Sequence, residues 1–260
     1  MRVPYYRVSA FTATPFGGNP AGVCLLPVAL PDHLLQSIAA ENNLSETAFL
    51  VPEGSDYGLR WFTPSVEVDL CGHATLASAH VLFHELGSAV QTLRFHTRSG
   101  CLTASRNGPS IELDFPSRPP QACDAPPHLV AGLNAQPAEV LRSRDYVAVF
   151  RSEEEVQALR PEMSLIATLD CLGVIATAPG RTCDFVSRFF APQAGVPEDP
   201  VTGSAHCSLI PLWANRLGKT TLSARQVSAR GGELSCRLNG DRVSIGGQCA
   251  TFQRGELQLS

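Results

Sequence analysis

The chain contains the same sequence pattern twice. Residues 60–64 (RWFTP) are echoed by residues 188–192 (RFFAP), and residues 72–74 (GHA) by residues 203–205 (GSA). Five further matches join Arg98, Gly100, Leu102, Asn107 and Gly108 to Arg230, Gly232, Leu234, Asn239 and Gly240. Solenoid repeats have periods of about 20–50 residues, so this much longer period indicates a duplicated domain of about half the chain. Two such domains that face each other would enclose a cleft, which is where small-molecule sites usually lie.

The duplication defines the expected domain organisation. A chain of 260 residues can form two domains of average size. We expect residues 1–117 to form the N-terminal half, residues 128–249 the C-terminal half, and the proline-rich residues 118–127 the linker. Each half is predicted to place short strands around one central helix, at residues 72–86 and 203–217, that is apolar or small on nearly all sides. Such a helix is enclosed by other structure, so the predicted fold class is α+β.

Composition excludes several classes of protein. The chain is 44% hydrophobic and 17% charged, with a formal net charge of −4, which gives no electrostatic signature for nucleic acid or an anionic membrane. No stretch has the length of a membrane helix or of a signal peptide. The nine cysteines are scattered without a Cys-x-x-Cys pair, which is a poor disulfide framework and a poor zinc site. We therefore expect a cytoplasmic protein with reduced thiols and no metal.

Both central helices are expected to begin at similar places, residues 71–73 (CGH) and 202–204 (TGS). A helix N-terminus offers unpaired backbone N–H groups and a partial positive charge, and glycine there lets a ligand approach the backbone closely. Gly72, Gly203 and Ser204 are therefore candidates for binding a substrate carboxylate. The alternative is that these glycines only allow the helices to pack tightly.

Three titratable residues are candidates for acid–base chemistry. His73 lies in the first helical turn, where the helix dipole lowers its pKa, so that a neutral imidazole could carry a proton near pH 7. Asp199 precedes the second helix and either closes a turn or takes part in catalysis. Glu46 begins an apolar strand, and an exposed strand end is the simplest interpretation. In a cleft, however, desolvation would raise its pKa toward the range of a general acid–base. Glu198 has a counterpart in Glu67, which hints at a repeated structural role.

Cys71 differs from its counterpart in the repeat, which is Thr202. A racemase that uses two thiols symmetrically needs a cysteine at both positions. The sequence therefore disfavours a symmetrical two-thiol mechanism.

Four motifs together resemble the PhzF family, which comprises the phenazine-biosynthesis isomerase and its relatives. They are residues 16–23 (FGGNPAGV), 43–49 (NLSETAF), 70–75 (LCGHAT) and 198–205 (EDPVTGSA). The resemblance implies the diaminopimelate-epimerase-like fold, with two pseudo-symmetric domains that each wrap a curved sheet around a central helix. It also implies that the C-terminal strand, residues 250–260, returns to the first domain, and that the protein is a cofactor-free, usually homodimeric enzyme.

The resemblance assigns roles to particular residues. Glu46 matches the glutamate that moves a proton between ring carbons of dihydro-hydroxyanthranilate, and His73, Asp199 and Ser204 match the other site residues. Asn19, in the first motif, joins Cys71, Gly72 and Gly203 as an expected substrate-binding residue. The related epimerases have a catalytic cysteine in each half, and here Thr202 replaces the second.

The leading hypothesis is an isomerase that shifts a proton on a small carboxylated metabolite, such as trans-2,3-dihydro-3-hydroxyanthranilate, with Glu46, His73 and Asp199 as catalytic residues. A second is an amino-acid racemase or epimerase that uses Cys71. A third is a non-catalytic homologue that binds a carboxylated metabolite.

Overall fold

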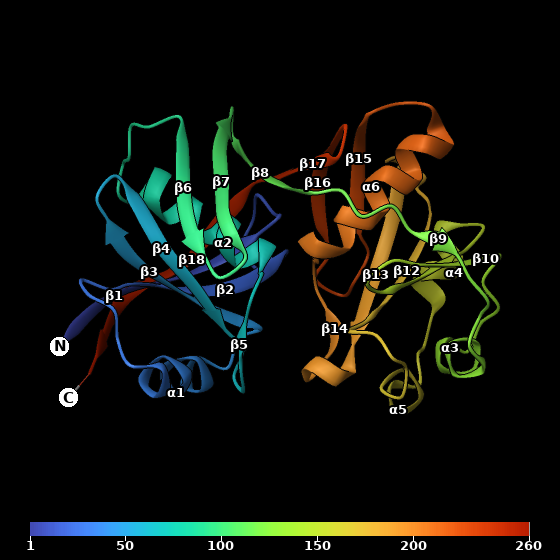
Figure 1. Cartoon of the computed structure of the whole chain (residues 1–260), viewed down its shortest axis with the longest axis horizontal. Helices are drawn as coiled ribbons and strands as arrows, with labels where there is room; N and C mark the ends of the chain where they lie inside the picture. The colour runs from blue at the N-terminus through green and yellow to red at the C-terminus, as the bar shows by residue number, and fades with distance from the viewer. Residues whose placement is uncertain (260) are drawn as a thin grey trace. The chain divides into compact units, whose positions relative to one another are not determined.

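The computed structural model describes residues 1–259 and divides into two compact units. Unit 1 comprises Met1–Asp114 together with Gly246–Ser260, and unit 2 comprises Phe115–Ile245 (Figure 1). The last strand, β18 (Cys249–Gln258), runs antiparallel to the first, β1 (Arg2–Ala10). Among the described residues, no helix is long and apolar enough to cross a membrane.

Unit 1 is a mixed sheet around a buried helix. Its other elements are β2 (Asn19–Leu25), α1 (Asp32–Asn42), β3 (Glu46–Glu53), β4 (Asp56–Phe62), β5 (Glu67–Val68), α2 (Gly72–His80), the π-helix η1 (Val81–Glu85), β6 (Thr92–Thr97), β7 (Gly100–Asn107) and β8 (Ser110–Pro116). Two pairs are parallel, β2 with β3 and β4 with β6, and the chain crosses between them through α1 and α2 respectively. The predicted helix at residues 72–86 is thus α-helical to His80 and π-helical beyond it.

The two helices of unit 1 pack in different surroundings. Every residue from Gly72 to Ala79 of α2 is buried, because this segment has only small, apolar or inward-bonded side chains. Helix α1 packs its Leu35 and Ile38 into a separate cluster that includes Phe49 of β3. Because side chains alternate across a strand, Glu46 and Ala48 of β3 lie on the face opposite Phe49. That is the face on which β3 meets α2, which lies among the strands in Figure 1.

Unit 2 repeats this topology. Its elements are β9 (Gln121–Ala122), α3 (Pro127–Leu133), β10 (Glu139–Arg142), β11 (Tyr146–Val149), α4 (Glu153–Ala158), α5 (Met163–Ile166), β12 (Val174–Pro179), β13 (Phe185–Ala191), η2 (Pro192–Ala194), β14 (Val196–Asp199), α6 (Gly203–Leu217), β15 (Thr221–Gln226), β16 (Gly232–Asn239) and β17 (Arg242–Gly247). The parallel pairs are β11 with β12 and β13 with β15, in the places of β2 with β3 and β4 with β6. Helix α6 takes the place of α2, so the repeat in the sequence is a repeat in structure.

The segment that was expected to link the two halves is part of a folded unit. The segment expected as a linker, residues 118–127, lies in unit 2 and contains β9, which pairs with β10. Pro31 is the N-cap residue of α1, and the Asp32 carboxylate accepts a hydrogen bond from Arg60. Strands β7 and β8, and likewise β16 and β17, are joined by tight turns in which Gly108 and Gly240 adopt positive φ.

Candidate active site

In unit 1, the fold brings Glu46, His73 and Cys71 together. Glu46 begins β3 on the face toward α2, and Cys71 and His73 lie on either side of the first residue of α2. His73 Nε2 lies 3.2 Å from Glu46 Oε2, and His73 Nδ1 lies 3.5 Å from Cys71 Sγ. The Glu46 side chain is only 17% exposed, so the simplest reading of it as an exposed strand end is wrong. The three residues form a row of thiol, imidazole and carboxylate.

His73 is a neutral group in this row. It is buried, and desolvation lowers its pKa to about 3. Its contact with Glu46 is within ion-pair distance, but the imidazole carries no charge at neutral pH, so the contact is polar rather than ionic. The two atoms are close without being aligned as a hydrogen bond. Catalytic hydrogen bonds in unliganded enzymes are often poorly aligned and tighten only with substrate.

The same three side chains are the ones that could hold a metal ion. Each offers one ligand atom, and these atoms lie within 4.8 Å of one another. The row, however, presents one ring nitrogen of His73 to the thiol and the other to the carboxylate. A single ion cannot replace both contacts unless the ring turns, so the geometry fits a row of polar contacts better than a chelate.

The two central helices begin in the same way. Cys71 and Thr202 are the N-cap residues of α2 and α6, both are extended, and neither side chain makes a capping hydrogen bond. Gly72 and Gly203 are the buried first residues that follow, and Ser204 is partly buried. Each N-terminus therefore keeps the features of an anion site: a glycine, a positive helix end and no side-chain cap.

Asn19 is buried at the first position of β2. Two residues further on, Ala21 is the register partner of Glu46 in the parallel pair β2 and β3. Asn19 therefore lies at the same end of the sheet as the carboxylate of the row.

In unit 2, Asp199 is held by its surroundings at two points. Its Oδ2 accepts a hydrogen bond of 2.6 Å from the Thr202 hydroxyl, and its carbonyl accepts one of 2.7 Å from Gln226 Nε2. Thr202, not Asp199, is the N-cap residue of α6. Asp199 is therefore fixed beside the start of the helix without capping it.

Gln226 is a site residue that sequence motifs do not reveal. It is 1% exposed, and its Oε1 accepts a hydrogen bond of 2.8 Å from the backbone N–H of Thr202 while its Nε2 holds Asp199. One signal could have found it: β15 alternates exposed and buried positions, and Gln226 falls on the buried side after Leu222 and Ala224. A glutamine at such a position needs buried polar partners.

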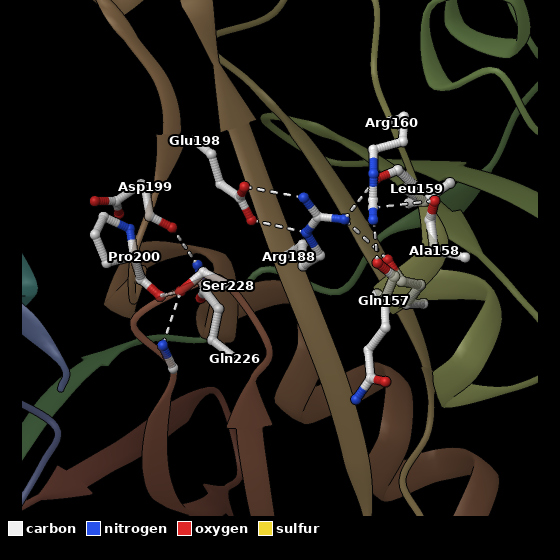
Figure 2. A network of polar contacts seen from close by, with 12 residues as sticks. Gln157, Ala158, Leu159, Arg160, Arg188, Glu198, Asp199, Pro200, Gln226 and Ser228 are labelled. Carbon is white, nitrogen blue, oxygen red and sulfur yellow. Dashed lines mark hydrogen bonds and ion pairs between the residues drawn. The ribbon is translucent and has the colours of Figure 1, made fainter.

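An arginine–glutamate pair holds the short strand in front of each helix. In unit 2, Arg188 donates to both carboxylate oxygens of Glu198, at 2.7 and 2.9 Å, and to the carbonyl of Leu159 (Figure 2). It also donates to the carbonyl of Val156. In unit 1, Arg60 makes the corresponding forked contact with Glu67, at 2.7 Å for both bonds. The repeated structural role inferred for the two glutamates is this forked pair.

A serine adds a second repeated anchor. Ser99 Oγ donates to the carbonyl of Asp69 at 2.7 Å, and Ser228 Oγ donates to the carbonyl of Pro200 at 2.8 Å. Each serine follows the end of the strand after the central helix by two residues. The segment that leads into each helix is thus tied down on both sides.

The architecture defines a protein with two similar α+β units, each with an uncapped helix N-terminus enclosed by a mixed sheet. Among solved structures, a probable proline racemase from Agrobacterium radiobacter shares this fold, with a TM-score of 0.66 at 12% identity over 99% of this chain and 93% of that chain. The predicted diaminopimelate-epimerase-like fold is confirmed.

The family follows from closer similarities. The model of the PhzC-PhzF family, described as phenazine biosynthesis-like protein, matches residues 8–255. A Pseudomonas aeruginosa protein named an uncharacterized isomerase is 53% identical over 259 residues, and a human phenazine biosynthesis-like domain-containing protein is 42% identical over 288; the matches cover 100% and 99% of each chain. The crystal structure of a PhzF family protein from Enterococcus faecalis superposes with a TM-score of 0.97 at 49% identity, covering both chains fully. The chain belongs to the PhzF family.

Proposed function

We propose that the protein is an isomerase that moves a proton within a small carboxylated substrate without a cofactor. The observation that carries this proposal is the partly buried Glu46 carboxylate 3.2 Å from a buried, neutral imidazole at the start of a helix. A carboxylate in such surroundings can take a proton from carbon and return it. The reaction class is also supported by the relatives that are named isomerases.

The proton transfer needs only one base. Glu46 removes a proton from one carbon, and the electron pair of the broken C–H bond moves into the adjacent unsaturated system of the substrate. The same carboxyl group then returns the proton to another carbon, so that nothing is oxidised or reduced. His73, with its N–H toward Glu46, would stabilise the carboxylate between the two steps.

The N-termini of α2 and α6 are each proposed to bind substrate. The backbone N–H groups at Gly72 and Gly203 suit a carboxylate, because each begins an uncapped helix. Asn19, Cys71 and Ser204 are proposed as further contacts.

Asp199 is proposed to orient a substrate amine or hydroxyl group. Its hydrogen bonds to Thr202 and Gln226 support this role, since they keep the residue in one place.

The test is isomerisation in deuterated water followed by proton NMR, first with trans-2,3-dihydro-3-hydroxyanthranilate and then with other small amino and hydroxy acids. We expect wild type to incorporate deuterium and Glu46→Gln to lose this activity. Glu53→Gln, at the far end of the same strand, is the matched control and should behave as wild type. Equal deuterium incorporation by wild type and Glu46→Gln would contradict the role of Glu46.

A racemase that uses Cys71 is the second candidate, because the thiol lies in the row beside His73. It requires an opposite base, and the counterpart residue Thr202 is not a thiol and is engaged with Asp199. This candidate predicts that enantiopure amino acids racemise and that Cys71→Ser abolishes the activity. A non-catalytic metabolite-binding protein would instead bind a carboxylated ligand equally well after Glu46→Gln and turn over nothing.

We also propose that the protein works as a homodimer in the cytoplasm. Support comes from the family resemblance and from the nine cysteines, all of which are free thiols. Light scattering coupled to size-exclusion chromatography tests the dimer directly; a monomer mass at micromolar concentration would contradict it.

A further inference from the structure

The row in unit 1 gives the two nitrogens of one imidazole different neighbours. The Cys71 thiol lies 3.5 Å from Nδ1 of His73, and a Glu46 carboxylate oxygen lies 3.2 Å from Nε2. His73 and Cys71 are both buried. The location of the ring proton therefore decides which neighbour faces an N–H donor and which faces a nitrogen lone pair.

A neutral imidazole carries a single N–H, and burial keeps His73 neutral by lowering its pKa to about 3. With the proton on Nε2, the ring donates toward the carboxylate, and Nδ1 accepts from the thiol S–H. With the proton on Nδ1, a ring lone pair would face the ionised Glu46 at 3.2 Å, and the thiol would have to accept, which sulfur does weakly. Both contacts are therefore favourable only when the thiol donates to the imidazole and the imidazole donates to the carboxylate.

We propose that Cys71 is a positioning residue that keeps His73 in the Nε2–H tautomer while Glu46 gains and loses a proton. An ionised Glu46 favours this tautomer by itself, because a carboxylate only accepts. A protonated Glu46 can donate as well as accept, and the neighbour on Nδ1 then decides. The expected effect of Cys71 on catalysis rests on the proposed acid–base role of Glu46. The assignment of the His73 tautomer does not depend on that role.

Unit 2 contains a histidine that serves as an internal reference. His206 Nδ1 lies 2.8 Å from the carbonyl oxygen of Thr202, and burial lowers its pKa to about 4. A carbonyl only accepts, so His206 carries its proton on Nδ1. The two buried histidines at the starts of α2 and α6 are thus expected to hold opposite tautomers.

The tautomers can be read directly from long-range 1H–15N correlation spectra of the 15N-labelled, full-length protein at pH 7. We expect His73 to show the Nε2–H pattern in wild type and in Glu46→Gln, where the neutral amide imitates a protonated carboxyl group. Adding Cys71→Ser to Glu46→Gln keeps a hydroxyl donor and should preserve the pattern. Adding Cys71→Ala should replace it by the averaged shifts of a tautomer mixture. The unchanged Nδ1–H pattern of His206 would show that unit 2 is folded in every variant, and unchanged backbone amide shifts of the strands around α2 would show the same for unit 1.

Two outcomes would overturn the proposal: an Nδ1–H pattern for His73 in wild type, or no change when Cys71→Ala is added to Glu46→Gln. Kinetics adds a second reading. Cys71→Ala alone should lower kcat, and Cys71→Ser should restore it. Spectra as expected with no turnover of any acid would reject the proposed function and leave the tautomer assignment standing. Turnover that depends on Glu46, with spectra that do not depend on Cys71, would support the proposed function and reject the positioning role of Cys71.

Discussion

The two units share a scaffold but differ in the chemistry they place on it. Each has a forked arginine–glutamate pair and a serine that donates to a backbone carbonyl. In each, the central helix begins with glycine and follows an N-cap residue whose side chain makes no capping hydrogen bond. Where α2 has Cys71 and His73, α6 has Thr202 and Ser204. The thiol and the imidazole therefore lie in unit 1, while the corresponding positions of unit 2 hold hydroxyl groups.

The position that corresponds to Glu46 shows the difference most clearly. Thr47 pairs with Phe62 in unit 1, and Val174 pairs with the counterpart Phe190 in unit 2, so Gly173 takes the place of Glu46. A Cβ atom at Gly173 would lie 2.4 Å from the ring of Phe189 and 2.9 Å from the carbonyl oxygen of Phe190, so a side chain there would require these groups to shift. Both units keep the same strand pairing, but only unit 1 has a carboxylate at this position.

The largest expected effect comes from removing that base. Glu46→Gln should lower the rate of deuterium incorporation by roughly 10²–10⁴-fold, the usual contribution of a general acid–base. Single-turnover NMR or chromatographic assays measure it, with Asp199→Asn as the comparison in unit 2. We expect Asp199→Asn to raise KM as well as lower kcat, because it orients substrate. A smaller loss in kcat for Glu46→Gln than for Asp199→Asn would contradict the proposal that the base lies in unit 1.

The forked pairs should differ in what they contribute to stability. Arg188 is 11% exposed and also satisfies two backbone carbonyls, so Arg188→Met should lower the free energy of unfolding by about 3 kcal/mol. Arg60 is 29% exposed, and without it Glu67 keeps its contact with Arg98, so Arg60→Met should cost about 1 kcal/mol. Urea denaturation followed by fluorescence measures both. Equal losses would mean that the two pairs are energetically equivalent despite their different burial.

Acid should destabilise both units through their buried histidines. Burial depresses the pKa of His73 to about 3 and that of His206 to about 4, below the value of about 6.5 in an unfolded chain. The stability from each neutral ring is complete above pH 6.5 and is lost as the pH falls toward 4, because the unfolded state then binds more protons. For His206 this loss is about 2 kcal/mol between pH 6.5 and 4.5.

His206→Thr isolates the contribution of unit 2 to this acid sensitivity. Its counterpart Thr75 already donates through its hydroxyl to the carbonyl of Cys71 at 2.6 Å, so threonine can make the same contact without titrating. Unfolding curves between pH 4 and 8 should have a shallower slope for His206→Thr than for wild type. An unchanged slope would place the acid sensitivity elsewhere.

The sequence predicted the parts of the fold that depend on local pattern. The repeat predicted the two units, and the runs of small and apolar residues predicted α2 and α6 with their starts at Gly72 and Gly203. It did not predict the contact between Gln226 and Asp199, which are 27 residues apart, nor that between Ser99 and the Asp69 carbonyl, 30 residues apart. Bonds from a side chain to a distant backbone atom leave no periodic pattern, because they depend on how the strands bring the two segments together. The motifs placed Glu46, His73 and Cys71 in one expected site, but only the tertiary structure shows that His73 lies between the thiol and the carboxylate.

A last comparison concerns the glutamine that distinguishes unit 2 from unit 1. The end of β15 corresponds to the end of β6, where Thr97 bonds locally to Gly100 and not to the segment before the helix. Gln226→Leu keeps much of the buried volume but leaves the Thr202 N–H and the Asp199 carbonyl without this partner, which should cost about 1–3 kcal/mol.

Thr97→Val is the matched change in unit 1, and it should cost less than about 1 kcal/mol, since the hydrogen bond from Thr97, at the end of β6, to Gly100 is exposed. Thermal unfolding measures both changes. Gln226→Leu should also raise KM, because Asp199 is no longer held, whereas Thr97→Val should leave kinetics unchanged. A loss of stability in Gln226→Leu without a change in KM would mean that Gln226 supports the fold of unit 2 and that Asp199 keeps its position through Thr202 alone.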